Sequence, residues 1–75
     1  MSRKQKQRSM KVLKVSEIIK ALKEDGWFLA HHKGTSHRQF KHPTKKGKVT
    51  VNGKLSGDVS GDLLKSIESQ SGLVF

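Results

Sequence analysis

The stretch His37-Arg38-Gln39-Phe40-Lys41-His42-Pro43 is the clearest strand in this 75-residue sequence. Its side chains alternate between two faces, with Arg38, Phe40 and His42 on one and His37, Gln39 and Lys41 on the other. Pro43 ends the strand because it has no N–H to donate to a neighbouring strand. Residues 37–42 are therefore expected to form a strand with one face toward a core.

Two further strands flank this one. Residues 27–33 are aromatic and apolar and then polar, and residues 48–52 place Val49 and Val51 toward the core, after a turn at 44–47. Asn52-Gly53 is a typical hairpin turn. The residues that follow, Leu55 to Asp58, make a poor strand, so we expect a loop there.

One amphipathic helix is expected before the strands in the sequence and a second one after them. The first is expected over residues 16–25, with Ser16 as N-cap and Gly26 at its end, and Trp27 folding back onto Leu22. The second is expected over residues 61–70, capped by Ser60 and stopped by Gly72, with Leu73 packing back on Ile67.

The predicted order is thus α-β-β-β-α, an α+β fold. A three-stranded antiparallel sheet with both helices on one face would bury all the apolar stripes together. This is the arrangement of the double-stranded-RNA-binding domain, although a fold alone does not define a function.

Charge is the main compositional signal. The chain has 16 Lys and Arg against 6 Asp and Glu, a net charge of +10. Residues 1–9 form a basic tail that we expect to be disordered, and residues 10–75 are expected to form one domain. Without the tail, 12 cations and 6 acidic residues remain, so the domain itself is basic. Such a domain favours a polyanionic partner, most often nucleic acid.

Other classes are disfavoured. The sequence has no cysteine, which excludes disulfides and thiolate metal sites. No apolar run reaches the ~18 residues of a membrane span, and no apolar segment follows the basic start as in a secretory signal. We therefore expect a cytoplasmic protein with no membrane association, monomeric when free.

His37 is the candidate catalytic residue. It lies at the start of a strand, among cations and without a nearby carboxylate in the sequence. Histidine titrates near neutrality and can act as general base or acid in RNA cleavage. His31 and His42 are expected to be half-buried, and His32 to lie on the polar face. No metal or other cofactor is expected, because adjacent His31 and His32 point to opposite faces of a strand.

Several cations are candidate RNA contacts. They gather on the predicted strands and the turn between them, at Lys33, Arg38, Lys41, Lys45 and Lys46. Lysines near a phosphate would stabilise developing charge and give salt-dependent affinity. Alternation places Arg38 on the face opposite His37. Lysines on edge strands also prevent sheet-to-sheet aggregation, so both interpretations stay open.

From Lys14 to Leu73 the sequence resembles the HicA-type toxins, small messenger-RNA interferases of toxin–antitoxin systems. The resemblance is carried by a set of short motifs in order: Lys14-Val15-Ser16-Glu17-Ile18-Ile19, Gly26-Trp27, Lys33-Gly34, Ser36-His37, His42-Pro43, Val49-Thr50-Val51 and Leu64-Lys65-Ser66-Ile67. Two departures are an extra Thr35 between Gly34 and Ser36, and Asn52-Gly53 where other members often have proline.

The resemblance implies a toxin that cleaves messenger RNA without a divalent metal, with His37 as the catalytic residue. It also implies a HicB-type antitoxin that binds the toxin and blocks the site. Two other classes remain open from the residues alone. One is a non-catalytic RNA-binding module of the double-stranded-RNA-binding type, and the other is a module whose basic face docks an acidic protein.

Overall fold

The computed structural model describes residues 11–34 and 36–75. The expected disorder of the tail at 1–9 lies outside the described residues, and so does the extra Thr35. The helices and strands, in chain order, are β1 Val12–Lys14, α1 Val15–Glu24, β2 Phe28–Lys33, β3 His37–Lys41, β4 Val49–Asn52, β5 Asp58–Ser60 and α2 Gly61–Ser71.

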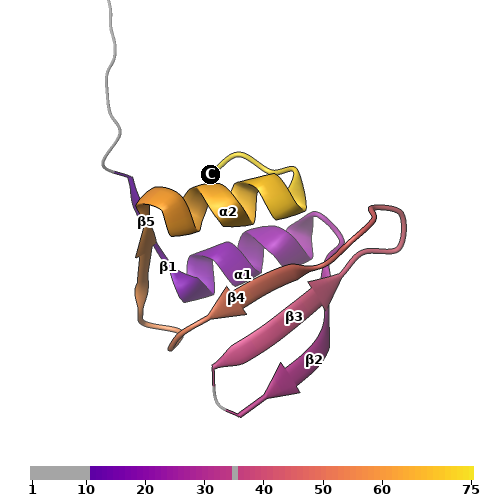
Figure 1. Ribbon diagram of the computed structural model, residues 1–75, viewed down its shortest axis with the longest axis horizontal. Helices are drawn as coiled ribbons and strands as arrows, with labels where there is room; N and C mark the ends of the chain where they lie inside the picture. The colour runs from indigo at the N-terminus through magenta and orange to yellow at the C-terminus, as the bar shows by residue number, and fades with distance from the viewer. Residues whose placement is uncertain (1–10, 35) are drawn as a thin grey trace, which may run out of the picture.

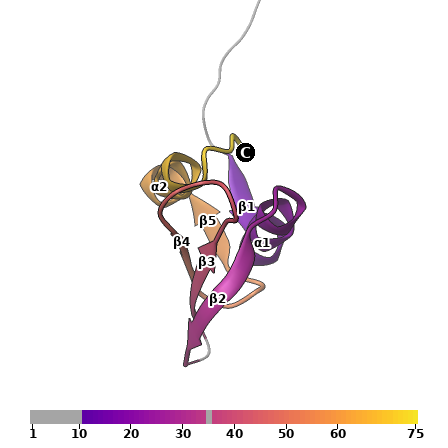
Figure 2. The same ribbon diagram turned by 90° about the vertical axis from the view of Figure 1, so that its right-hand side faces the viewer.

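The main sheet has the order β2-β3-β4, with both pairs antiparallel. Helices α1 and α2 lie next to each other beside it, and the short β1–β5 pair closes one end of the molecule (Figures 1 and 2). The predicted α+β architecture, with a three-stranded antiparallel sheet and two helices as in the double-stranded-RNA-binding domain, is confirmed.

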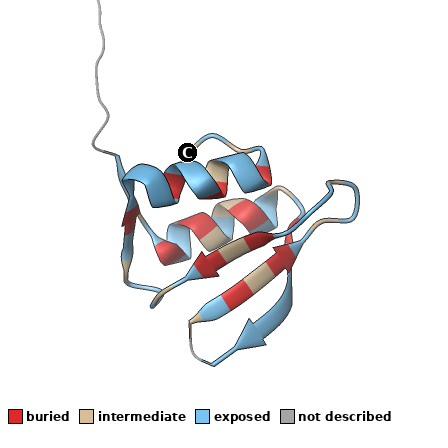
Figure 3. Cartoon of the chain, in the orientation of Figure 1, coloured by how far each residue is buried: buried red, intermediate tan, exposed pale blue. Residues whose placement is uncertain are grey.

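The core lies between the helices and the inner face of β3 and β4. Buried positions alternate along both strands and recur along one side of each helix (Figure 3). Its buried apolar residues are Val15, Ile18, Leu22, Trp27, Phe40, Val49, Val51, Val59, Leu64 and Ile67. β2, in contrast, is exposed along its whole length, so it extends beyond the cover that the helices provide.

The start of α1 differs from the expectation. The N-cap is Lys14 and not Ser16, and its backbone N–H donates to the Glu17 carboxylate at 2.8 Å. Val15 is already helical and fully buried, because β1 delivers the chain directly into the helix. The end of α1 is as predicted: Gly26 has φ +104°, and the Trp27 N–H donates to the Leu22 carbonyl at 2.9 Å.

The small β1–β5 sheet was missed by the sequence patterns. Leu13 lies opposite Val59, and the Lys14 ammonium pairs with Asp58 at 2.7 Å. The loop expected through Asp58 therefore ends one residue earlier, and Asn52-Gly53 does not form a hairpin, since β5 pairs with β1 and not with β4. A three-residue strand whose partner lies more than 40 residues away has too little local pattern to be recognised.

A β-bulge in β2 changes which face its residues occupy. Leu29 is opposite Phe40 while His31 is opposite Gln39, so Ala30 is an extra residue in this strand. The bulge moves His31 off the inner face, and the expectation that His31 is half-buried is wrong: it is exposed. His32 pairs with Arg38 instead.

Helix α2 is close to the prediction. It starts after Ser60, although the Ser60 hydroxyl makes no capping hydrogen bond, and it ends at Gly72 in the left-handed conformation with φ +76°. Leu73 packs against the core. Within the described part of the chain, neither helix has the length and apolar character needed to cross a membrane.

Candidate active site

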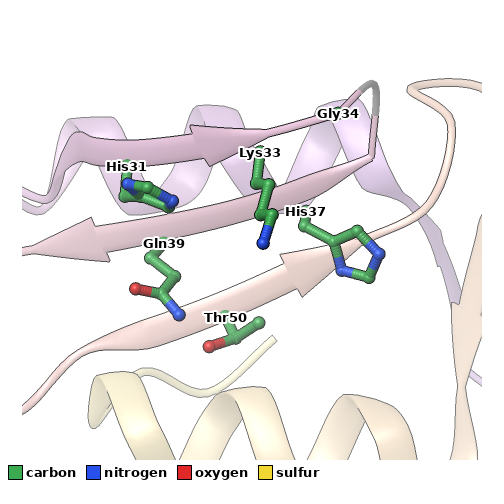
Figure 4. A pocket seen from close by; sticks show the side chains of 6 residues that line it. All are labelled: His31, Lys33, Gly34, His37, Gln39 and Thr50. Carbon is green, nitrogen blue, oxygen red and sulfur yellow. The ribbon is translucent and has the colours of Figure 1, made fainter.

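The outer face of the main sheet, which the helices leave open, carries a hollow of about 570 Å³ (Figure 4). It is lined by His31, Lys33, Gly34, His37, Gln39 and Thr50. Figure 4 shows these side chains on one side of the three strands, with the Lys33 amine extending between His37 and Gln39. The hollow is an open site on the sheet, lined by polar residues whose exposed surface there is mostly carbon.

The register of the strands explains why these residues share a face. Lys33 is directly opposite His37 in the β2–β3 pair, and His31 is opposite Gln39. Gln39 is in turn opposite Thr50 in the β3–β4 pair. Side chains directly opposite each other in antiparallel strands lie on the same face, so three strands contribute to one surface.

His37 is exposed at the first position of β3. On its β2 side it faces Lys33, and on its β4 side it faces Asn52. Its ring Nδ1 lies 3.0 Å from the Asn52 side-chain oxygen Oδ1. An exposed imidazole held at one nitrogen, with a cation directly opposite, is suited to proton transfer next to a phosphate.

Residues 15–73 match the family described as HicA toxin of bacterial toxin-antitoxin. The chain belongs to the HicA toxin family. It is therefore the toxin component of a toxin–antitoxin system, as the resemblance implied. No curated protein shows a significant match to the chain.

The predicted cations of this HicA-family chain separate into groups. Lys33 lines the hollow, and Lys41 follows Gln39 by two positions on β3 and is exposed on the same face. Lys46 is exposed in the loop between β3 and β4. The structure therefore brings Lys33 and Lys41 to the face of His37.

Arg38 lies on the opposite, inner face. Only 8% of its surface is exposed, and its guanidinium Nη1 donates to the Gly53 carbonyl at 2.8 Å. This bond ties β3 to the turn that follows β4. The alternation expected from the sequence is thus confirmed, and Arg38 does not join the hollow.

Lys45 is held by α1. Its ammonium lies 2.6 Å from the Asp25 carboxylate and 3.1 Å from the Ser71 carbonyl. The hydrogen bond and charge of Lys45 hold the pKa of Asp25 below its ordinary value, and the Trp27 indole N–H adds a further hydrogen bond in the same direction. Lys45 therefore joins α1, the β3–β4 loop and the end of α2.

His42 belongs to the same cluster. Its Nε2 lies 2.7 Å from the Asp25 carbonyl oxygen, and its Nδ1 accepts from the backbone N–H groups of Thr44 and Lys45 at 3.1 and 3.2 Å. These partners define a neutral ring with its proton on Nε2. The ring meets Trp27 edge-on at 5.2 Å, so His42 is a structural residue, half-buried as expected.

Among residues 11–34 and 36–75, no group of three or more His, Asp or Glu side chains is arranged to hold a metal ion. His31 and His37 share the outer face, whereas His32 lies opposite Arg38 toward the inner face. The residues that the sequence patterns missed are Asn52, Gln39 and Thr50. Gln39 could have been found from its alternation with His37, but Asn52 was interpreted only as a turn residue.

Proposed function

We propose that this toxin is an endoribonuclease that cleaves messenger RNA on the outer face of the sheet, with His37 as the catalytic residue and without a divalent metal. The observation that carries the proposal is the placement of exposed His37 directly opposite Lys33 at an open hollow. Membership of the HicA toxin family supports it. A messenger-RNA substrate also places the activity in the cytoplasm.

The proposed reaction uses only proton transfer and charge stabilisation. His37 removes the proton of a ribose 2′-hydroxyl, and the 2′-oxygen bonds to the adjacent phosphorus. The bond from phosphorus to the 5′-oxygen breaks as that oxygen takes up a proton. Lys33 stabilises the negative charge that develops on the phosphate, and Lys41 contacts the RNA backbone further along the same face.

The leaving oxygen needs an acid, and the bulge in β2 supplies a candidate. It places His31 on the wall of the hollow, with His37 and Lys33. His32, the neighbouring histidine, lies toward the other face. We therefore assign the proton donor to His31.

A HicB-type antitoxin is the proposed inhibitor. The outer face has no cover from the helices, and its exposed cations include Lys33 and Lys41. A partner with acidic side chains would neutralise them and block access to His37. The free toxin is proposed to be a monomer.

The test is cleavage of a purified messenger RNA in EDTA, comparing wild type with His37→Ala and His31→Ala. General acid–base catalysis contributes about 10²–10⁴-fold, so His37→Ala should lose activity by this factor. His31→Ala should also lose activity, because the 5′-oxygen would then leave without its positioned proton donor. Both side chains are exposed, so circular dichroism should show unchanged folding.

His32→Ala is the matched control. His32 is an exposed histidine of β2, next to His31, and it lies toward the other face of the sheet. It should cleave like wild type. Full activity of His37→Ala would overturn the assignment of the catalytic residue. Binding of RNA without cleavage by wild type would indicate the non-catalytic RNA-binding module instead.

A further inference from the structure

The side chain of Asn52 is the partner of His37 on β4. Asn52 is the last residue of the strand and is directly opposite His37, with Oδ1 3.0 Å from Nδ1. The Thr50 N–H donates to the Gln70 side chain of α2 at 2.9 Å and so points away from β3. The Gln39–Thr50 pair is therefore of the type without mutual hydrogen bonds, and so is the His37–Asn52 pair two residues along. In such pairs the side chains approach most closely.

The chemistry of this contact sets the state of the imidazole. An amide oxygen only accepts hydrogen bonds, so Nδ1 must carry a proton to bond to Oδ1. A neutral imidazole has one protonated nitrogen, and the lone pair is then on Nε2. The bond to Asn52 consequently presents His37 as a base through Nε2.

We propose that Asn52 is a positioning residue that holds neutral His37 with its proton on Nδ1, so that Nε2 removes the proton of the 2′-hydroxyl. This inference rests on the proposed function. In the proposed reaction, Asn52 touches no reacting atom and acts by orienting the His37 ring.

Among the described residues, the His37 ring forms its hydrogen bond with the Asn52 side chain alone. The side chain directly opposite on β2 is Lys33, whose ammonium only donates. His31 lines the hollow two positions before Lys33 on the same strand. Because the Asn52 amide is neutral, it orients the ring without adding a charge that would hold the imidazole protonated.

The first test observes the ring directly, by long-range ¹H–¹⁵N NMR of the free protein at a pH where His37 is neutral. Wild type should show His37 with a protonated Nδ1 and an unprotonated Nε2. In Asn52→Ala this signal should change to the Nε2-protonated form that unconstrained histidine favours. His42, whose partners define an Nε2-protonated ring, is the internal reference in the same spectrum.

An Nε2-protonated His37 in wild type would overturn the inference, because the Asn52 amide would then donate to Nδ1. An Nδ1-protonated ring that persists in Asn52→Ala would also overturn it. Neither reading requires activity, so this test can fail while the proposed function holds.

The second test is kinetic. Residues that orient metal-binding histidines contribute about 10–100-fold to activity, and we expect a similar loss of kcat in Asn52→Ala, with little change in KM. Asn52→Asp keeps an acceptor oxygen and should retain the Nδ1 proton, but its carboxylate should shift the acidic limb of the pH–rate profile upward. Equal kcat in wild type and Asn52→Ala would overturn the inference. Absence of cleavage by wild type would overturn the proposed function and with it the role of Nε2 as base, while the NMR test would still decide whether Asn52 holds the proton on Nδ1.

Discussion

At the scale of single residues, His37, the first residue of β3, and His42, which directly follows the last, have opposite roles. His37 is exposed and bonded through one nitrogen. His42 is bonded through both nitrogens to backbone groups and packs on Trp27. The His42 ring also packs so closely against the backbone at Gly26 that a Cβ at this position would lie 2.8 Å from His42 Nε2. Burial and hydrogen bonding, and not residue type, separate the structural histidine from the candidate catalytic one.

His42→Ala should therefore destabilise the fold. It leaves the Asp25 carbonyl and two backbone N–H groups without their partner, and it opens a space beside Trp27. The loss of an extensively bonded, largely buried group is worth about 2–3 kcal/mol in the free energy of unfolding. Urea denaturation measures it, with exposed His32→Ala expected to lie within about 0.5 kcal/mol of wild type. If His42→Ala lost no more stability than His32→Ala, the structural role of His42 would be contradicted.

At the scale of elements, the Asp25–Lys45 pair joins the end of α1 to the loop between β3 and β4. Lys45 lowers the pKa of Asp25 in the folded state relative to the unfolded chain. A carboxyl group with a lowered folded pKa contributes stability above its unfolded pKa, which lies near 3.8. That contribution is lost as the pH falls through the folded pKa.

Asp25→Asn should flatten the acid side of the stability profile. Wild type should lose more stability than Asp25→Asn between about pH 5 and pH 2, because only wild type has this carboxylate to protonate. Thermal unfolding followed by circular dichroism across this pH range measures the difference. Asp62→Asn, an exposed carboxylate in the first turn of α2, is the comparison. Parallel profiles for wild type and Asp25→Asn would show that the pair does not stabilise the fold.

At the scale of the whole molecule, the two faces of the main sheet have different roles. The inner face of β3 and β4 is apolar and covered by helices, whereas the outer face carries His37 with the cations Lys33 and Lys41. A net charge of +10 attracts a polyanion from all directions, but only the outer face combines cations with His37. The fold thus keeps its stabilising residues apart from its candidate catalytic ones.

RNA binding should accordingly depend on salt, with a contribution from each lysine on that face. Each phosphate contact to single-stranded RNA contributes about 0.7 to the slope of log affinity against log salt concentration. In the His37→Ala background, which leaves the RNA intact, Lys33→Ala and Lys41→Ala should each reduce the slope by this amount. Fluorescence anisotropy from 50 to 200 mM salt measures it. The control is Lys20→Ala, which removes an exposed lysine of α1 and should leave the slope almost unchanged. An equal reduction of the slope by all three substitutions would mean that the lysines attract RNA nonspecifically.

Local patterns were sufficient for much of this protein. The alternation of residues 37–42, the valines of β4 and the apolar stripes of both helices defined the main sheet, its cover and the outward placement of His37. Gly26 and Gly72 marked the helix ends, because a left-handed residue is required there. These features follow from side-chain periodicity and backbone sterics within a few residues.

Other features depend on residues far apart in the chain. The β1–β5 pair, the bulge at Ala30 that moves His31 to the outer face, and the Asn52–His37 bond arise from strand register, which no short segment specifies. The sequence by itself determined the architecture and the candidate catalytic histidine. Only the tertiary structure decided which side chains surround that histidine, because an antiparallel sheet places residues together by pairing and not by proximity in sequence.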